Sequence, residues 1–321
     1  MPLTQSTRTA LLTLALIGLA GHLTAAQAPR SRPSRPNTEE AMAKAEVETY
    51  KTVGDTRLKL YIFTPDGHRP DRPRPAVVFF FGGGWLRGSP GQFAPHCERL
   101  ARQGMVAITA DYRVYNRQRA KVMDCVADAQ SAIRWVRANA KRLGIDSDRI
   151  AAGGGSAGGH LAAATATLRD FTEGENKSIS FRPNALLLFN PPLDLRMTRP
   201  RAGNASERSP EIRARLGTKA DELSPAAHIK PALPPTIIFH GKADALIPYS
   251  SMESFTRQMK SAGNRCELHG FEGQGHGFFN PGKSGGKYFD ETLKLAEEFL
   301  ASLGYLKTTT SAPAAARTGG R

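Results

Sequence analysis

One serine stands in the glycine-rich stretch GGGSAGGH, residues 153–160. Glycine loses more conformational freedom on folding than any other residue, so such clustering needs a structural reason. Residues 154–158 read G-x-S-x-G and lie between a predicted strand and a predicted helix. This is the pattern of a nucleophile elbow, a sharp turn that exposes the serine hydroxyl. Ser156 is therefore our candidate nucleophile; the alternative is a glycine-rich turn without a chemical role.

A serine hydroxyl needs a base to activate it and an acid to orient that base. In a fold with this elbow, the acid and then the base follow the serine along the chain. Asp244 follows the predicted buried strand in PPTIIFHGKAD, and His276 lies in the glycine-flanked loop GQGHGF after the last predicted strand. Loops at the carboxyl ends of parallel strands face one crevice. We therefore predict Asp244 as the acid and His276 as the base.

Other residues compete for these roles. His160 lies four residues past Ser156, where we expect it to point along the helix into packing or solvent. His240 precedes the acid at the end of a strand, and His269 is predicted within a strand. Asp194 is the rival acid, disfavoured by the same chain order.

Acyl transfer also requires donors for the oxyanion. Three glycines follow a buried strand in FFFGGGWLRG and allow backbone N–H groups to face a reacting carbonyl. We predict Gly83 and Gly84 as donors, together with the backbone amide of Ala157. A structural turn is the alternative for this glycine run taken alone.

Strands and helices alternate along the chain, which predicts a mostly parallel sheet of about eight strands with helices on both faces, an α/β fold. The segments RPAVVFF, MVAIT, ALLLF and TIIFH are continuous apolar runs, typical of strands buried on both faces. In the predicted helix DCVADAQSAIRWVRANAKRLG, the four residues Val126, Ala129, Ile133 and Val136 share one face, and Gly144 is expected to end the segment. An insertion, residues 194–234, separates two of the strands, and its His228 is a candidate substrate contact.

These motifs together resemble the α/β-hydrolase superfamily, in particular hormone-sensitive-lipase-like and acetyl-xylan or feruloyl (BD-FAE-like) esterases, over about residues 47–305. The resemblance rests on GGGW, DYR, GGSAGG, IIFHGKAD and GHGF. Phe81 stands where these families have a histidine that braces the oxyanion loop, so packing must brace it here. Asp111 of DYR is expected to brace a loop rather than act in catalysis. For Trp85 two roles stay open, lining the acyl pocket or covering the loop.

The ends of the chain differ from its centre. Residues 1–28 combine Arg8, an apolar run and small residues near Ala26 and Ala28, the layout of a secretory signal peptide, with an uncleaved anchor as the alternative. Residues 29–46 are predicted to be a flexible linker and residues 306–321 a disordered tail. The catalytic domain is then 47–305, and the protein is expected to be secreted or periplasmic.

Composition narrows the choice of partner. The net charge is +15, of which seven positive charges lie in residues 1–36 and 307–321. No zinc finger, aromatic RNA platform or basic helix accompanies that charge, so we predict no nucleic-acid partner. Cys97, Cys125 and Cys266 do not identify a disulfide pair and have no metal-ligand spacing, so no metal is predicted. The glycine-rich stretch is neither a phosphate loop nor a dinucleotide site, and no cofactor is predicted. The oligomeric state stays open.

The sequence thus predicts a serine carboxylic-ester hydrolase that works through an acyl-enzyme. Glycine-rich approaches to the serine and the lack of a large lid favour short acyl groups, such as acetate on a plant polysaccharide. A prolyl-oligopeptidase-type peptidase shares the fold and the triad order, but residues 29–46 are too few for its extra domain. A non-catalytic binding protein on the same scaffold is the second alternative, although binding alone would need none of the triad.

Overall fold

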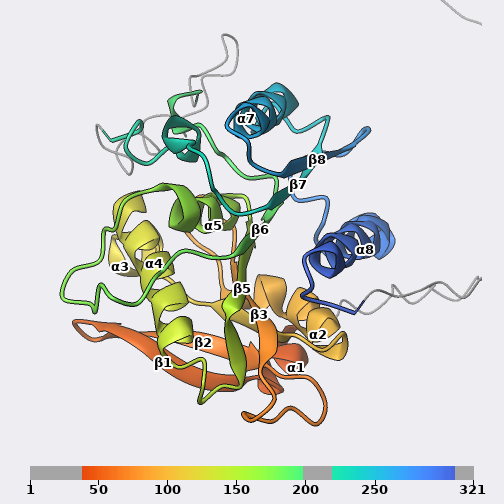
Figure 1. Cartoon of the computed structure of the whole chain (residues 1–321). Coiled ribbons are helices and arrows are strands. Elements are labelled where there is room, and N and C mark those ends of the chain that lie inside the picture. The colour runs from red at the N-terminus through yellow and green to blue at the C-terminus, as the bar shows by residue number, and fades with distance from the viewer. Residues whose placement is uncertain (1–37, 198–218, 308–321) are drawn as a thin grey trace, which may run out of the picture. The chain divides into compact units, whose positions relative to one another are not determined.

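The structure is a computed structural model that describes residues 38–197 and 219–307. The predicted signal peptide and most of the predicted C-terminal tail lie outside the described residues. The centre of the fold is an eight-stranded sheet with the order β1-β2-β4-β3-β5-β6-β7-β8 (Figure 1). β2 runs antiparallel to β1 and to β4, and the other neighbours pair in parallel. The predicted α/β-hydrolase fold is confirmed.

The strands have the following bounds: β1 Glu46–Val53, β2 Thr56–Phe63, β3 Arg74–Phe80, β4 Val106–Ala110, β5 Ile145–Gly155, β6 Ala185–Phe189, β7 Thr236–Gly241 and β8 Cys266–Phe271. The helices are α1 Thr38–Ala43, α2 Ala94–Arg102, α3 Tyr115–Gln118, α4 Val122–Ala138, α5 Ala157–Thr167, α7 Tyr249–Ser261 and α8 Lys287–Ser302. Short 3₁₀ turns are η1 Pro90–Phe93, η2 Leu195–Met197, η3 Pro225–His228 and η4 Ser284–Gly286.

Two hydrophobic layers cover the sheet. Side chains alternate between its faces, so Val78 and Phe80 of β3 join the layer formed with α4, α5 and α7, while Val77 and Phe79 join the layer of α1, α2 and α8. Every residue of β3 after Arg74 is buried, as expected of a central strand covered on both faces. β3 and β5 pair at the middle of the sheet, and the glycine-rich loops begin at their carboxyl ends.

The predicted face of α4 is confirmed, because Val126, Ala129, Ile133 and Val136 are all buried. The helix ends earlier than expected, at Ala138 rather than Gly144. Gly144 instead adopts a φ of 59° in the turn that leads into β5.

The prediction of a flexible linker over 29–46 is wrong for its last part. Thr38–Ala43 form α1, whose Ala41 and Met42 pack into the α2/α8 layer, and β1 begins at Glu46. These residues carry enough apolar surface to pack, and the catalytic domain therefore starts before residue 47. At the other end, Leu306 also packs into that layer, beyond the predicted limit of 305.

His96 of α2 is buried inside an aromatic cluster. Phe93 and Phe289 lie 4.6 and 4.8 Å from its ring, measured between centroids. Neither ring nitrogen has a hydrogen-bond partner among the residues that the structure describes. Burial lowers the pKa of His96 from its ordinary 6.5 to about 3, because no acceptor compensates the charged form.

We expect His96→Leu to weaken the acid sensitivity of the fold. In the native state His96 stays neutral below pH 6.5, whereas in the unfolded chain it takes up a proton, so stability falls as pH drops from 6.5 towards 3. At pH 5 this penalty is on the order of 2 kcal/mol. Urea unfolding of both proteins at pH 7.5 and pH 5 measures the free energy of unfolding at each pH. If both proteins lost the same free energy of unfolding between pH 7.5 and pH 5, the lowered pKa of His96 would be contradicted.

Three further observations concern the cysteines, metal binding and membrane-spanning helices. Cys97, Cys125 and Cys266 are buried and unpaired with one another. Within the described ranges, no cluster of three or more His, Cys, Asp or Glu side chains is arranged to hold a metal ion. No helix in the same ranges is long and apolar enough to cross a membrane.

Candidate active site

Ser156 lies at the turn between β5 and α5. Its φ of 52° and ψ of −121° are strained values for a residue with a side chain. Its N–H donates to the Phe189 carbonyl at 2.8 Å, which anchors the turn to β6. A Cβ on Gly158 would fall on the Phe80 carbonyl and within 2.5 Å of the Phe81 oxygen, so only glycine fits there. The turn is the predicted elbow, held by close backbone packing.

Two hydrogen bonds join Ser156, His276 and Asp244. The serine Oγ lies 2.9 Å from His276 Nε2, and His276 Nδ1 lies 2.7 Å from Asp244 Oδ2. An ionised carboxylate only accepts, so Nδ1–H donates to Asp244 and Nε2 is left to accept the serine proton. The structure therefore brings together the three side chains predicted from the sequence, although Ser156 and His276 are 120 residues apart in the chain.

Asp244 is held in the charged form. Burial opposes ionisation, but the hydrogen bond from His276, the charge of that ring when it is protonated, and the N–H groups of Ile247 and Leu246 outweigh it and lower the pKa of the carboxyl. Both of these N–H groups donate to Oδ1, at 3.0 and 2.8 Å, which leaves Oδ2 for His276. The side chain is fully buried, whereas that of His276 is 21% exposed. The candidate base is thus partly exposed to solvent, whereas the carboxylate of the candidate acid is not.

The loops that carry the acid and the base are joined by their backbones. The acid loop follows β7 and the base loop follows β8, the two last strands of the sheet. The N–H of Ala243 donates to the Gln274 carbonyl at 3.0 Å, and that of Lys242 donates to Phe271 at 2.9 Å. These bonds fix the separation of Asp244 and His276.

The candidate oxyanion loop follows β3, next to β5. The parallel register pairs Phe80 with Gly154, so the strand ends bring this loop beside the elbow. Gly83 and Gly84 have φ values of 128° and 63°, which favour glycine. The N–H of Ala157 belongs to the first turn of α5 and has no acceptor within the helix. The N–H of Gly82, in contrast, donates to Gln92 Oε1 at 2.6 Å.

Phe81, which replaces the histidine of similar families, is braced by Tyr112. The two rings stack with centroids 4.1 Å apart, and both side chains are buried. The Tyr112 hydroxyl also donates to the Phe81 carbonyl at 2.7 Å. Asp111, the preceding residue, accepts from the Tyr112 N–H at 3.0 Å and pairs with Arg117, which is a loop-bracing arrangement.

The competing residues are engaged elsewhere. His160 is buried with Nε2 2.7 Å from the Leu223 carbonyl oxygen, and burial lowers its pKa to about 4. His269 lies within β8, as predicted, and Asp194 forms an ion pair with Arg196 at 2.7 Å. His240 is the exception, because its Nε2 lies 3.5 Å from Asp244 Oδ2 and 2.9 Å from the Ile247 carbonyl oxygen. Burial lowers the pKa of His240, so a neutral ring supports the acid loop.

The two candidate substrate contacts have different settings. Trp85 is only 5% exposed and its indole meets the His160 ring edge-on at 5.2 Å, so it mainly covers the loop. His228 ends η3, where Nε2 lies 3.1 Å from the Asp221 carbonyl oxygen. Contact of either residue with substrate stays a prediction.

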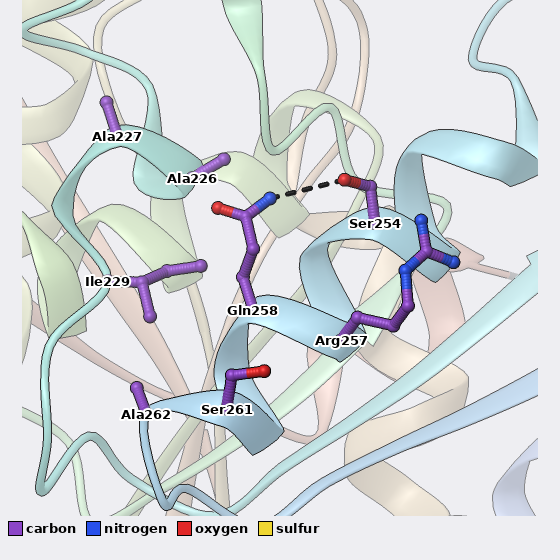
Figure 2. Close-up of a pocket in the computed structure, with 8 residues that line it drawn as sticks. All are labelled: Ala226, Ala227, Ile229, Ser254, Arg257, Gln258, Ser261 and Ala262. Atoms are coloured by element: carbon purple, nitrogen blue, oxygen red, sulfur yellow. Dashed lines mark hydrogen bonds between the residues drawn. The ribbon is translucent and has the colours of Figure 1, made fainter.

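A surface pocket lies between η3 and α7 (Figure 2). Ala226 and Ile229 form one side, and Arg257 and Gln258 of α7 form the other, where Gln258 donates to Ser254 at 3.2 Å. His228 and the three residues of the hydrogen-bonded chain do not line it. The pocket is therefore separate from the candidate active site.

Comparison with solved structures agrees with this geometry. The fold matches Thermogutta terrifontis esterase 2 phosphonylated by sarin, with a TM-score of 0.79 and 50% identity over 83% of this chain and 97% of that chain. The same esterase with propionate bound matches with a TM-score of 0.77 and 51% identity, over the same shares of the two chains. The protein is thus a carboxylic ester hydrolase of the α/β-hydrolase fold.

Sequence comparison identifies the family. The BD-FAE family model matches residues 60–259, so this chain belongs to the BD-FAE family. Esterase LipC of Mycobacterium tuberculosis is 32% identical over 230 residues, which are 65% of this chain and 54% of LipC. A probable isoprenylcysteine alpha-carbonyl methylesterase of Oryza sativa is 29% identical over 68% of this chain and 55% of that protein. The chain spans about half the length of the curated relatives it matches.

Proposed function

We propose that this esterase is an exported serine hydrolase of short-acyl esters. The observation that carries the proposal is the continuous chain of hydrogen bonds from the Ser156 hydroxyl through His276 to Asp244. A neutral imidazole with Nε2 facing the hydroxyl is the state needed for general-base activation.

In the proposed reaction, Ser156 Oγ bonds to the ester carbonyl carbon while its proton moves to His276 Nε2. The carbonyl π-electron pair moves to the oxygen, and the N–H groups of Gly83, Gly84 and Ala157 stabilise that oxyanion. When the carbonyl reforms, the bond to the alcohol oxygen breaks, and the alcohol leaves with the proton from His276. Water then attacks the acyl-enzyme by the same route, which releases the carboxylic acid and restores Ser156.

The acyl group is proposed to be short. Thermogutta terrifontis esterase 2, about half of whose residues are identical, has solved structures with propionate and with butyrate bound. Acetyl groups on an extracellular polysaccharide would suit both this size and an exported enzyme. A prolyl-oligopeptidase-type peptidase is the alternative to exclude, because it would use the same three residues on an amide.

The export part of the proposal rests on the sequence of residues 1–28, which lie outside the described residues. An apolar run followed by Ala26 and Ala28 suits cleavage after either alanine. The location is then secreted or periplasmic.

One set of measurements tests these proposals. We expect kcat/KM to be highest for p-nitrophenyl acetate, propionate or butyrate and at least tenfold lower for the octanoate, with aminoacyl p-nitroanilides slower still.

Mass spectrometry after treatment with a fluorophosphonate should place one adduct on Ser156. The same measurement should show whether the exported protein begins after Ala26 or Ala28. Faster anilide cleavage would favour the peptidase, and failure to label Ser156 would overturn the mechanism.

A further inference from the structure

We infer that Gln92 and Asn280 act as a positioning pair that holds the oxyanion loop against the loop of the catalytic base. Gln92 belongs to η1, directly after the oxyanion loop, and Asn280 lies four residues beyond His276. The inference rests on the function proposed above, because it assigns a role in placing that site's groups.

A chain of three hydrogen bonds carries the inference. The Gly82 N–H donates to Gln92 Oε1 at 2.6 Å, and Gln92 Nε2 donates to Asn280 Oδ1 at 3.0 Å. Asn280 Nδ2 then donates to the Gly277 carbonyl at 2.7 Å. The chain begins next to the candidate oxyanion donors and ends at the residue that follows His276.

The direction of these bonds is fixed at both ends. A backbone N–H only donates, so Gln92 must present its oxygen to Gly82 and its NH₂ to Asn280. A backbone carbonyl only accepts, so Asn280 must present its NH₂ to Gly277 and its oxygen to Gln92. Each amide thus has one orientation that satisfies both partners, which gives the bridge a defined geometry. Both side chains are half-buried, so water competes less for these bonds than on an open surface.

The position of Gly82 explains why such a bridge affects catalysis. A Cβ built on Gly82 would lie 3.3 Å from the Ser156 Cβ and 2.9 Å from the Gly155 carbonyl oxygen. The backbone that Gln92 holds is therefore packed against the nucleophile and continues directly into Gly83. Displacements of about 1 Å in such groups lower rates by up to about 10²-fold.

The base loop needs this support because the sheet supports it from one side only. In the part of the chain that the structure describes, β8 is an edge strand that pairs with β7 alone, and His276 follows it by five residues. The Ala243–Gln274 bond ties the base loop to the acid loop, and the Gln92–Asn280 bond ties it to the opposite side of the site. The imidazole is thus located relative to the acid and to the oxyanion loop by separate contacts.

Gln92→Met removes the bridge while it conserves the length of the side chain. We expect kcat for p-nitrophenyl butyrate to fall by roughly 10- to 100-fold, with KM within about threefold of wild type. Butylboronic acid, whose adduct is tetrahedral, should bind more weakly by a similar factor, whereas butyrate should bind as before. Asn280→Leu should have the same effects, and the double variant should be no worse than the stronger single one, because both lose one bridge.

Gln130→Met is the matched control. Gln130 also accepts from a backbone N–H, that of Phe171 at 2.8 Å, and donates to a carbonyl, that of Arg169 at 2.7 Å. Neither of these hydrogen bonds involves a candidate catalytic residue. The variant should therefore lose stability but keep the wild-type kcat per folded molecule.

Folded Gln92→Met or Asn280→Leu enzyme with a kcat within twofold of wild type would overturn the inference, as would additive effects in the double variant. Ser156→Ala, assayed in parallel, distinguishes failure of the proposed function from failure of the positioning pair. Retained activity in Ser156→Ala would refute the proposed function, whereas an inactive Ser156→Ala beside a fully active Gln92→Met would refute the positioning pair alone.

Discussion

Ser156→Ala is expected to lower kcat for p-nitrophenyl butyrate by about 10⁵- to 10⁶-fold while the protein stays folded. The hydroxyl is the protein group that bonds to the acyl carbon in the proposed reaction, and removal of the nucleophile in a triad costs about that much. The methyl group of alanine keeps the elbow packed, because Gly158 and the Ser156 N–H bond to Phe189 are unchanged. Steady-state kinetics and a thermal melt of the same preparation measure the two quantities.

Ser131→Ala is a suitable control for this substitution. Ser131 is a buried serine on α4 whose Oγ donates to the Ala127 carbonyl at 2.8 Å, in a polar cluster with Lys51 and Glu175. Its loss should alter stability and leave kcat near wild type. Comparable kcat values for the two alanine variants would remove Ser156 from the mechanism.

Asp244→Asn is expected to lower kcat by about 10⁴-fold with little change in structure. The N–H groups of Leu246 and Ile247 both donate to Oδ1, so the asparagine oxygen must occupy that position. Its NH₂ group then faces His276 Nδ1 and makes that nitrogen an acceptor. The proton moves to Nε2, which can no longer take the proton of Ser156.

The competing carboxylate provides the control for this change. Asp194→Asn breaks an ion pair with Arg196 and should reduce kcat by less than twofold. If Asp194 were the acid, Asp194→Asn would show the large loss of kcat and Asp244→Asn the small one. A crystal structure of the Asp244→Asn protein with His276 in place would show that the lost rate comes from the tautomer rather than from displacement.

The parts of the candidate site that depend on local motifs could be predicted from the sequence. The elbow around Ser156 is contiguous, and Gly154 and Gly158 are required by their contacts with each other and with Phe80 of β3. Asp244 and His276 could be predicted because each follows a buried strand directly, and the ends of parallel strands meet at one edge of the sheet. The distances of 2.9 and 2.7 Å between these groups match that expectation.

Other features could not be predicted from one sequence. Gln92 and Asn280 are 188 residues apart, and amide side chains at such positions carry no pattern that distinguishes a bridge from a solvated surface. The role of His240 was also missed, because its contact with Asp244 depends on how the acid loop folds back over β7. In β1 four of the eight side chains are exposed and a single one, that of Tyr50, is buried, so the alternation that marks a half-buried strand is absent.

Because β8 lies at the edge of the sheet, the parts of the site differ in how easily they open locally. Ser156, the proposed nucleophile, directly follows β5, which has strands on both sides and helices on both faces, whereas His276 follows β8, the edge strand of the described sheet. Local opening at a sheet edge requires less free energy than opening at its centre. We therefore expect the first structural fluctuation that stops turnover to separate the His276 imidazole from the Ser156 hydroxyl. Ser156 would keep its native surroundings, and activity would return once β8 pairs with β7 again.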